Sequence, residues 1–531
     1  MHNSAVGYAL GRLMQVMGII LLVPLGISVW DHWPKAIAEM VVQPETLGFE
    51  LAILTGIVAG TVFVKLFREG RELQGIKEGY AIVTLGWIVL ALLSSIPLFL
   101  YFLSDQSNGW SCVLGCFTDA YFEVMSGFTT TGATVFSDVE SLPKSLLFLR
   151  SLTHWLGGMG IITLALVIFP SMGVAAYQIF RGEVPGVTKD KLRPKLSQTA
   201  SILWGVYVLF TGAEVVLLMV GGMSLFDAIN HAFATMATGG FSTQNDSLAG
   251  YNDYIQWVVV FFMYLAGVNF VLHFRALRGE LSVMTRNREF IFYTGVVLAA
   301  IIVITGVLHI NGQASADHAA RSYRHEPMTQ HEFLEHYEDQ AEENDSLYDS
   351  FRLASFQTLA IVTTTGFATA DFDLWPDFIR VLLVLLMFFG GCAGSTGGGI
   401  KMIRIMIAFK VAQNVLRKLT QPKLVAPVKV GGQVIDDNMV VSVVSFFILF
   451  VGLFVVVALL MMLFVDDIVT AVTCSVATIA NIGPGLSGIG AVENYGWIPG
   501  PGKWILIFSM LLGRLEIFTV LIVLRPAVWK K

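Results

Sequence analysis

Residues 122–134 read FEVMSGFTTTGAT, and three later stretches share this plan: HAFATMATGGFST at 231–243, LAIVTTTGFATAD at 359–371 and VATIANIGPGLSG at 476–488. Each is a moderately apolar run that ends in glycine, too long for a turn and too short to cross a hydrocarbon core about 30 Å thick. Their glycines Gly132, Gly239, Gly366 and Gly483 are separated by 107, 127 and 117 residues. A unit that recurs at a nearly fixed period predicts four copies around one axis.

The composition places these stretches in a membrane protein. Of the 531 residues, 55% are hydrophobic and 14% are charged, against roughly 25% charged in a soluble domain. A span needs roughly 20 apolar residues. Ten such segments are predicted, at about 9–30, 48–66, 79–103, 145–170, 200–222, 255–274, 289–309, 376–408 (interrupted), 438–464 and 503–525. The runs are continuously apolar rather than alternating, which excludes a β-barrel.

The distribution of basic residues predicts the orientation of the chain. With both termini in the cytoplasm, 24 of the 33 Lys and Arg residues fall on the inner side, as the positive-inside bias requires. The first apolar segment lacks a small-residue cleavage pattern, so we interpret it as a retained span rather than a signal peptide.

The predicted fold class is therefore an all-α, polytopic membrane protein with four pseudo-symmetric units, each consisting of a span, a pore half-helix and a returning span, around one pore. Two extra N-terminal spans precede them. The predicted divisions are 1–75 for the extra spans, 76–198, 199–288, 289–430 and 431–531 for the four units, with an acidic outer insert at 311–350 in the third.

Four glycine loops at membrane depth predict a shared aqueous pathway. Non-helical backbone is tolerated there only when protein or a water-filled cavity surrounds it. Glycine allows the loops to approach one another closely, and rings of carbonyl oxygens can replace the hydration shell of a monovalent cation. The residues predicted to bind the ion are Thr130, Thr131, Gly132, Thr238, Gly239, Thr364, Thr365, Gly366, Asn481, Ile482 and Gly483. Asn481 and Ile482 make the fourth loop different, so the ring is only pseudo-symmetric.

At these residues the sequence resembles the membrane subunit of the Trk/Ktr/HKT potassium transporter superfamily. The motifs that carry the resemblance are FTTTGAT, HWLGGMGII, ATGGFST, TTTGF, GCAGSTGGGIK, ANIGPG and LLGRLE. The two extra spans look like those of the TrkH/TrkG-like subunit rather than the shorter Ktr type. The resemblance implies a selectivity filter with potassium at Gly132, Gly239, Gly366 and Gly483. Related plant proteins that favour sodium can carry serine at the first of these positions, so Gly132 favours potassium.

The resemblance also implies a setting and partners. It implies a bacterial inner membrane, a homodimer of this subunit and a cytoplasmic nucleotide-binding regulatory subunit of the TrkA type. The basic inner loops suit an acidic regulator. No nucleotide-binding glycine motif occurs in the sequence, so we expect potassium as the transported ion, no cofactor in this chain and no nucleic-acid partner. The surrounding lipid is the remaining partner.

A glycine-rich stretch interrupts the eighth predicted span. Six of the ten residues 390–399 are glycine, and each interior glycine costs a helix about 1 kcal/mol relative to alanine. We expect a flexible loop below the filter that gates permeation, as its family counterpart is thought to do, formed by Gly394, Ser395, Thr396, Gly397, Gly398 and Gly399. The alternative is a seam of small residues for close helix packing.

Arg514 lies in the middle of the tenth predicted span. An arginine at that depth costs roughly 2.5–3.5 kcal/mol on insertion scales, so it should face the pore or a buried acid. It could hold the gate loop closed by hydrogen bonds or set an electrostatic barrier. The alternative, a structural pair with Glu516, is disfavoured because residues two apart on a helix do not face each other. In the other three returning spans, glycine occupies the corresponding position: Gly158, Gly267 and Gly391.

Other charged residues leave alternatives open. Glu214, Arg150 and His154 could form a proton relay or could lock helices together by buried hydrogen bonds. Asp138, Asp246, Asp371 and Asp373 follow the glycine loops and could attract cations or cap the loops. In the insert, His331 and His336 are five residues apart, which favours a solvated acidic loop over a metal site.

Three classes of function are compared. Channel-like potassium uptake driven by the membrane potential is the leading prediction. A proton- or sodium-coupled potassium symporter on the same scaffold, using Glu214 or His154, is the alternative. An intramembrane enzyme is disfavoured because no nucleophile–base or metal-binding set recurs in the sequence.

Overall fold

The structure is a computed structural model of the chain, and it describes residues 3–32, 43–71, 75–104, 113–160, 196–311, 346–423 and 427–529. Within these residues the protein is built almost entirely from helices, and one short antiparallel hairpin pairs β1 (Lys429–Val430) with β2 (Gln433–Val434). Most of the insert at 311–350, including His331 and His336, lies outside the described residues, as does the second half of the fourth predicted span.

Six helices in the described part of the chain are long and apolar enough to cross a membrane. They are α1 with α2 (Asn3–Ile20 and Leu22–Asp31), α4 (Pro44–Leu66), α5 with α6 (Ile76–Ser94 and Ile96–Ser104), α11 (Leu196–Val220), α16 (Arg288–Ile310) and α22 (Asp437–Met461). Local sequence sets their starts: Pro44 occupies the first turn of α4, and the Asn287 side chain caps α16 by accepting the Phe290 N–H over 2.9 Å. These six correspond to the first, second, third, fifth, seventh and ninth predicted spans.

Four shorter helices precede the glycine loops. They are α7 (Val113–Phe128), α12 (Leu225–Met236), α19 (Leu347–Val362) and α23 (Ile468–Ile479). Ser224, Ser346 and Asp467 cap three of them by accepting backbone N–H groups at the start of the helix. The second halves of all four helices are almost continuously buried, so these short helices lie inside the protein, surrounded by the longer ones.

Three of the four segments that return after the glycine loops are broken: α13 with α14 (Asp253–Ala266 and Phe270–Leu277), α20 with α21 (Asp377–Leu386 and Met402–Thr420), and α24 with α25 (Gly500–Arg514 and Phe518–Val523). The first returning segment begins with α8 (Lys144–Gly158) and is described only as far as residue 160. The bend between α13 and α14 is 104°, and Glu516 and Ile517 have φ values of 54° and 57°. The sequence analysis predicted a break only in the eighth span, so the prediction of continuous sixth and tenth spans is wrong.

Neighbouring helices pack closely next to two of the breaks. A Cβ atom at Gly267 would lie 2.5 Å from the Tyr293 hydroxyl of α16 and 2.9 Å from Thr363 Cγ2, just beyond the end of α19. A Cβ atom at Gly513, near the end of α24, would overlap the carbonyl of Ile479 at the end of α23. The returning helices therefore approach their neighbours too closely for a side chain at these two positions.

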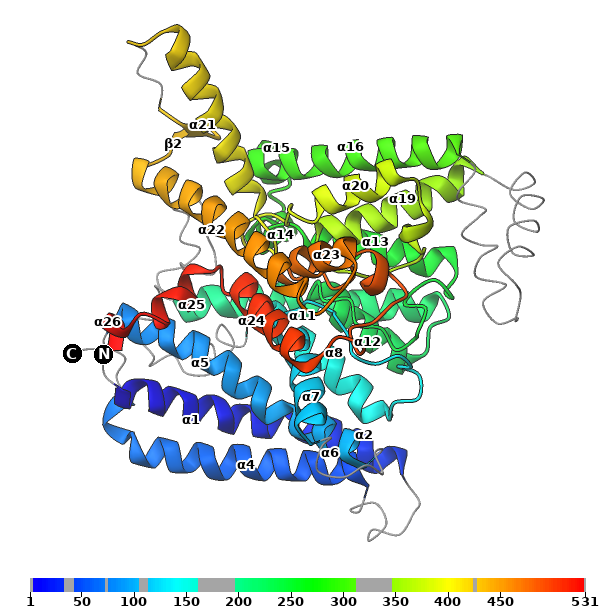
Figure 1. The fold of residues 1–531 in the computed structure, drawn as a ribbon, viewed down its shortest axis with the longest axis vertical. Coiled ribbons are helices and arrows are strands. Elements are labelled where there is room, and N and C mark those ends of the chain that lie inside the picture. The colour runs from blue at the N-terminus through cyan, green and yellow to red at the C-terminus, as the bar shows by residue number, and fades with distance from the viewer. Residues whose placement is uncertain are drawn as a thin grey trace.

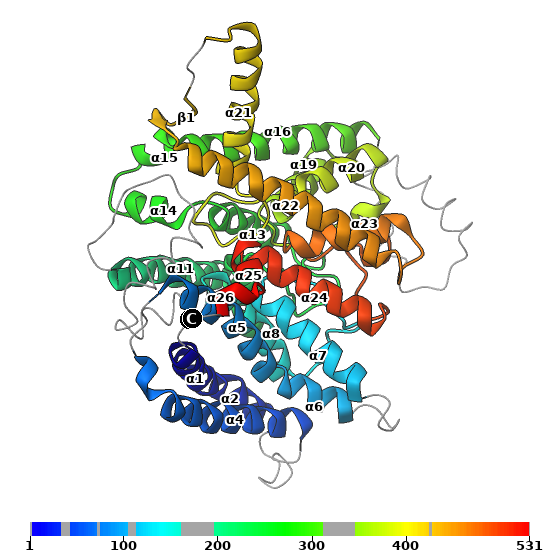
Figure 2. The same ribbon diagram turned by 60° about the vertical axis from the view of Figure 1, so that its left-hand side comes forward.

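The helices form layers across the molecule. Figure 1 shows α1 and α4 along one edge, α16 and α21 along the opposite edge, and the short helices between them. The view in Figure 2 agrees, with α1, α2 and α4 packed beside α5 and α6. The beginning of α1 and the end of the chain at α26 (Pro526–Trp529) lie close together on one side (Figure 1).

Candidate functional site

The four short helices end in the same backbone motif. The residue after each helix cap has a left-handed conformation, with φ of 53° at Thr130, 54° at Thr238, 61° at Thr364 and 57° at Asn481. The next residue donates its N–H to a carbonyl five residues earlier: Thr131 to Ser126, Gly239 to Ala234, Thr365 to Ala360 and Ile482 to Ala477. This is a Schellman ending, which usually has glycine at the left-handed position. Three β-branched threonines there store backbone strain, a feature that clusters at functional sites.

The repeated motif corrects the alignment of the second loop. Gly132, Gly366 and Gly483 lie two residues after the left-handed residue and have φ of 81°, 77° and 99°; in the second loop this position is Gly240, with φ of 82°. Gly239 instead corresponds to Thr131, Thr365 and Ile482. Aligning the Gly-Phe pairs at 240–241 and 366–367 would have given this register, whereas alignment on the first glycine after threonine did not.

The four loops close a ring through one repeated contact. A Cβ atom added to Gly132 would overlap the carbonyl oxygen of Gly239, one on Gly240 that of Thr365, one on Gly366 that of Ile482, and one on Gly483 would lie 2.6 Å from that of Thr131. Each loop thus meets the next, and the fourth returns to the first. Only glycine fits at these positions, because the obstructing atoms belong to the backbone and cannot rotate away.

One side of the ring opens into a cavity of about 160 Å³ that Gly132, Gly240, Gly366 and Gly483 all line. Asp246 also lines it. The other predicted mouth acids serve as loop acceptors: Asp138 accepts the Asn245 side chain over 2.9 Å, Asp371 accepts the Asp373 N–H over 3.3 Å, and Asp373 accepts the Ser487 N–H over 2.9 Å.

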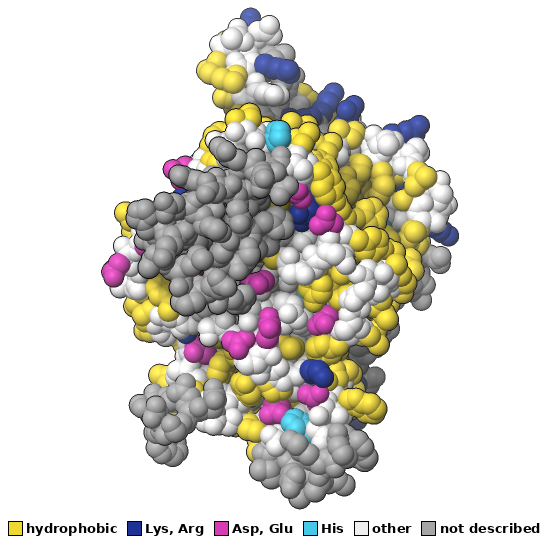
Figure 3. Space-filling model, turned by 90° about the vertical axis from the view of Figure 1, so that its right-hand side faces the viewer, with side chains coloured by type: hydrophobic (Ala, Val, Ile, Leu, Met, Phe, Trp, Pro, Cys, Tyr) yellow, Lys and Arg dark blue, Asp and Glu magenta, His cyan; other side chains and the backbone are white. Residues whose placement is uncertain are grey.

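Acidic side chains gather on one face of the molecule. Figure 3 shows Asp and Glu side chains across the middle of the face opposite the termini, while most of its visible Lys and Arg lie near the upper edge. The hydrogen bond from Asn245 lowers the pKa of Asp138, and burial raises that of Asp373. The hydrogen bonds of Asp138, Asp371 and Asp373 favour the alternative that these acids cap the loops. Asp246 lines the cavity, which favours the alternative that it attracts cations.

Polar side chains gather on the other side of the ring. Thr129 and Thr131 share a hydrogen bond of 2.8 Å, Thr363 and Thr365 share one of 2.7 Å, and Asn481 donates to Thr131 over 2.9 Å. Thr130 Oγ1 and Asn481 Oδ1 are buried without a hydrogen-bond partner in the described part of the chain. Buried oxygens without partners are costly unless a cation or water completes them.

The glycine-rich stretch forms a closed loop beneath this polar side. Its two ends meet at a parallel bridge between Phe389 and Ile400, where Gly390 donates its N–H to the Ile400 carbonyl over 2.9 Å. Gly394 and Gly399 have φ of 79° and 62°. Near its second end, Gly398 donates its N–H to Thr364 Oγ1 over 2.7 Å, and a Cβ atom there would overlap the Ala480 carbonyl.

Charged side chains fasten the base of this loop. Glu289 of α16 accepts the N–H groups of Ala393 over 2.7 Å and Ile403 over 3.1 Å, one on each side of the loop. Lys401 donates to the Gly397 carbonyl. Ser395 lines the adjacent cavity, and its buried hydroxyl has no partner in the described residues.

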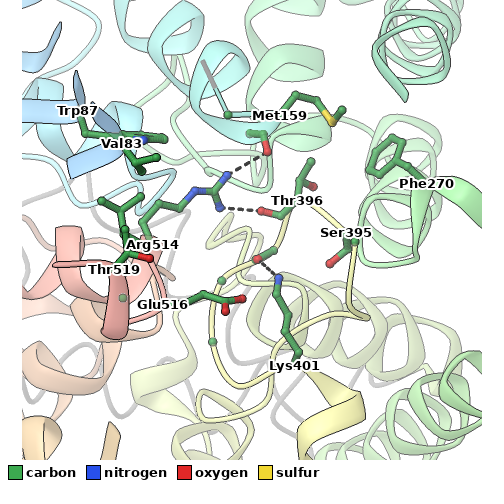
Figure 4. A pocket seen from close by; sticks show the side chains of 18 of the residues that line it. Val83, Trp87, Met159, Phe270, Ser395, Thr396, Lys401, Arg514, Glu516 and Thr519 are labelled. Atoms are coloured by element: carbon green, nitrogen blue, oxygen red, sulfur yellow. Dashed lines mark hydrogen bonds between the residues drawn. The ribbon is translucent and has the colours of Figure 1, made fainter. Parts of the chain in front are cut away.

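Arg514 joins α24 to the glycine-rich loop and to the end of α8. Its guanidinium donates to the carbonyls of Thr396 over 2.7 Å, Gly157 over 2.6 Å and Gly158 over 2.9 Å. The Thr396 hydroxyl donates in turn to the Met236 carbonyl over 3.0 Å. Figure 4 shows the guanidinium pointing from α24 toward Thr396, with Glu516 and Lys401 on the other side of the loop. A cavity of about 120 Å³ is lined by Gly158, Thr396, Lys401, Arg514 and Glu516.

Glu516 has a partner of its own. It pairs with Arg404 of α21 over 2.5 Å, whereas the three hydrogen bonds of Arg514 to Thr396, Gly157 and Gly158 all reach backbone carbonyls. These contacts favour a role of Arg514 at the glycine-rich loop.

Behind the ring, a buried ion pair ties the first two loops together. Arg150 pairs with Glu123 over 2.7 Å and donates to the Ser242 carbonyl over 3.1 Å. Glu123 also accepts the Val135 N–H over 2.9 Å. The sequence analysis missed Glu123, although a carboxylate inside an apolar run signals a buried cationic partner.

His154 and Glu214 differ in their surroundings. His154 Nδ1 bonds the Gly127 carbonyl over 2.8 Å, and its Nε2 accepts the Phe241 N–H over 3.3 Å. These contacts favour helix locking for His154. Glu214 is fully buried near Thr235, and neither carboxylate oxygen has a hydrogen-bond partner of good geometry in the described part of the chain. Among the described residues, no group of three His, Cys, Asp or Glu side chains could hold a metal ion.

Comparisons with known proteins give a consistent result. The family model of TrkH, described as a cation transport protein, matches residues 49–310 and 336–531. The "Trk system potassium uptake protein TrkH" of Salmonella typhimurium is 38% identical over 468 residues, covering 87% of this chain and 88% of the relative. The protein of that name from Halomonas elongata is 35% identical over 527 residues, covering 98% of this chain and 100% of the relative.

A solved structure is also similar over the whole chain. The crystal structure of the potassium transporter TrkH from Vibrio parahaemolyticus has a TM-score of 0.79 and 33% sequence identity, with 100% of both chains covered. The similarity therefore extends through the helices, the loops and the broken segments rather than to one motif alone.

Proposed function

The chain belongs to the TrkH family of cation transport proteins, and on this premise we propose that it conducts potassium ions into the cell through the ring of four loops. The membrane is the bacterial inner membrane. The membrane potential supplies about 2.3 kcal/mol per charge per 100 mV, so no coupled reaction is needed.

The repeated backbone of the four loops carries this proposal. Strained residues at Thr130, Thr238, Thr364 and Asn481 set the direction of the chain as it enters the ring. The carbonyls of Thr131, Gly239, Thr365 and Ile482 come from equivalent positions and meet neighbouring glycines. A ring of equivalent carbonyl oxygens can replace the water around a dehydrated potassium ion. The C-terminal ends of the four short helices add partial negative charge nearby.

We refine the predicted potassium site by replacing Gly239 with Gly240, so that it consists of Gly132, Gly240, Gly366 and Gly483. Gly239 contributes its carbonyl oxygen to the ring. Thr130, Thr131, Thr238, Thr364, Thr365, Asn481 and Ile482 remain part of the proposed filter. The buried oxygens of Thr130 and Asn481 without protein partners suit a partly hydrated ion on the inner side of the ring.

The loop from Gly394 to Gly399 and the side chain of Arg514 form the proposed gate. The loop contacts the inner side of the ring at Thr364 and Ala480, and Arg514 links it to the first unit through Gly157 and Gly158. Because the Arg514 guanidinium joins backbone carbonyls of separate segments, loss of its hydrogen bonds releases the loop from the ring. The alternative, a seam of small residues for close helix packing, would not need the hydrogen bonds that Thr396 makes.

The remaining organisation follows the same premise. We place four span, half-helix and span units at 76–198, 199–288, 289–430 and 431–531, after two extra spans, with both termini in the cytoplasm. The shared location of the chain ends in Figure 1 supports an even number of crossings. The name "Trk system" of the relatives supports a multi-subunit assembly, which we take to be a homodimer with a nucleotide-binding regulatory subunit.

Ion flux from liposomes tests the function. The purified chain should release potassium down its gradient when sodium and proton gradients are absent, and potassium should pass faster than sodium. Flux that requires a proton or sodium gradient would contradict channel-like conduction.

A coupled potassium symporter is the second candidate, and Glu214 is the observation that favours it. A fully buried carboxyl group without a hydrogen-bond partner of good geometry is expensive unless it is protonated or solvated. Under this alternative, Glu214→Gln would abolish the effect of a proton gradient on potassium flux. Under channel-like conduction, this variant would leave the ion selectivity unchanged.

A further inference from the structure

A hollow of about 760 Å³ lies away from the ion pathway, between α15 (Ser282–Arg286), the start of α16, the base of α21 and the β1–β2 hairpin. These elements come together at the upper edge of the molecule in Figures 1 and 2. Its lining is Arg286, Arg288, Ile291, Phe292, Met406, Lys410, Lys429, Gly431 and Gly432. We call this set the basic hollow.

The basic hollow holds cationic side chains without matching acids. Within the described parts of the chain, none of Arg286, Arg288, Lys410 and Lys429 forms an ion pair with a carboxylate. The acid next in sequence to Arg288, Glu289, already accepts two N–H groups at the gate loop. Like charges gathered around one cavity repel one another, and a bound anion removes this cost.

The geometry of the hairpin keeps the cavity open. Gly431 and Gly432 have φ of 59° and 83° and form its turn. A Cβ atom on Gly432 would meet nothing within 4 Å. Lys410 donates to the carbonyl of Lys429, which ties α21 to the hairpin and brings the two lysines to the same side of the cavity.

Apolar residues distinguish this cavity from a simple anion site. Ile291 and Phe292 belong to the first turns of α16, a candidate span whose outer surface includes the exposed Leu298 and Ile302. Ile291 is itself 44% exposed. The cations therefore lie at the end of an apolar membrane segment, where phospholipid head groups are found, and the apolar lining continues toward the acyl chains.

From this combination we propose that the basic hollow binds an anionic phospholipid. The phosphate contacts the cationic side chains from α15, α16, α21 and β1, and an acyl chain packs against Ile291, Phe292 and Met406. Free phosphate would use the charges and leave the apolar surface bare, and a zwitterionic lipid would bring a cation into an already positive cavity.

Native mass spectrometry of the full chain tests the proposal, with dioctanoyl phosphatidylglycerol as the probe. The test variant is Arg286→Gln/Arg288→Gln/Lys429→Gln. The matched control is Arg417→Gln/Lys418→Gln/Lys423→Gln, which removes the same charge from the exposed distal part of α21 and the residues after it. Because the test variant removes three of the four cations that line the hollow, it should lose at least about tenfold in affinity, and the control less than about twofold.

Two further measurements identify the ligand. Dioctanoyl phosphatidylcholine and inorganic phosphate should each bind the unmodified chain at least about tenfold more weakly than phosphatidylglycerol. The variant Arg286→Lys/Arg288→Lys/Lys429→Arg keeps the charges and should retain binding, which guards against a loss caused by misfolding.

Three outcomes would overturn the proposal. Equal binding of phosphatidylglycerol to the test and control variants would place lipid elsewhere. Equal affinity for inorganic phosphate would make the hollow a free-anion site. Unchanged lipid binding, with loss of association to an acidic cytoplasmic subunit in the test variant, would make it a protein contact. None of these outcomes depends on whether the chain conducts potassium.

Discussion

Arg514 and Thr396 are joined by a hydrogen bond of 2.7 Å from the guanidinium Nη1 to the backbone carbonyl. The same guanidinium also reaches Gly157 and Gly158, so one side chain connects the glycine-rich loop to the end of α8. The interaction lies between segments more than 100 residues apart, which makes it sensitive to movement of either one.

Arg514→Ala should make the chain leaky to potassium. Hydrogen bonds to a charged group contribute about 1.5–3 kcal/mol each, so loss of several should raise the flux at least about tenfold. The measurement is potassium release from liposomes at matched protein density. A lower flux from a normally folded variant would contradict the proposal that Arg514 holds the gate loop closed.

Arg514→Lys separates the two roles proposed for the arginine. Lysine keeps the charge but cannot reproduce the forked geometry of a guanidinium. A hydrogen-bonded latch predicts a flux between those of the unmodified chain and Arg514→Ala. A purely electrostatic barrier predicts that Arg514→Lys conducts no more than the unmodified chain.

Gly398→Ala should also raise the potassium flux. The new methyl group would overlap the Ala480 carbonyl and lie 3.1 Å from Asn481 Cβ, and forced overpacking costs about 1–3 kcal/mol. The loop would therefore move away from the inner side of the ring. Gly295→Ala is the control, because a Cβ atom at that position in α16 meets nothing within 4 Å. Equal flux in both variants would support a packing seam instead of a gate.

Gly132→Ser should reduce the preference for potassium over sodium. Gly132 combines a φ of 81° with a neighbouring carbonyl that leaves no room for a side chain, so serine must widen or tilt the ring. Gly222→Ser is the matched control: its φ is 95°, but nothing lies within 4 Å of the added atom. The ratio of potassium to sodium flux should change only in the first variant, and a similar change in both would assign the effect to general backbone strain.

Asp467→Ala should destabilise the protein by about 1 kcal/mol, because the Asp467 carboxylate caps α23. The carboxylate accepts the N–H groups of Val469 over 3.2 Å and Thr470 over 2.8 Å. Thermal unfolding in detergent measures the effect. Asp467→Asn should retain most of the stability since asparagine also caps helices, and Asp466→Ala should leave it unchanged.

The same carboxylate makes part of the stability depend on pH. Its hydrogen bond from the Thr470 hydroxyl, followed by backbone bonds, lowers the pKa of Asp467 from 3.8 to about 2. The folded chain therefore holds this proton less tightly than the unfolded chain, and the contribution present above pH 4 is lost as the pH falls toward 2. The gap in melting temperature between the unmodified chain and Asp467→Ala should narrow over this interval, and a constant gap would contradict it.

The repeats, the helical fold and the position of the glycine-rich loop follow from sequence because each depends on local composition. Apolar length predicts the spans, and a run of six glycines among ten residues predicts a break. The contribution of Arg514 to the loop was predicted from the cost of burying a charge.

Features that depend on contacts between units could not be predicted in this way. The close packing at Gly267 and Gly513, where neighbouring helices leave no room for a side chain, depends on contacts between distant segments, and neither segment contains a helix-breaking run. The partnership of Glu123 with Arg150 joins residues 27 apart across a loop. The register of Gly240 was missed for a different reason: two adjacent glycines gave two alignments, and only the alignment on the Gly-Phe pairs agrees with the backbone dihedral angles.

Anomalous diffraction from crystals grown in rubidium is the most direct test of the ring. The account predicts a peak surrounded by the carbonyl oxygens of Thr131, Gly239, Thr365 and Ile482, weakened in Gly132→Ser and retained in Gly222→Ser. A strong peak away from these four oxygens, with none between them, would contradict the claim that the loops form one ion-binding ring.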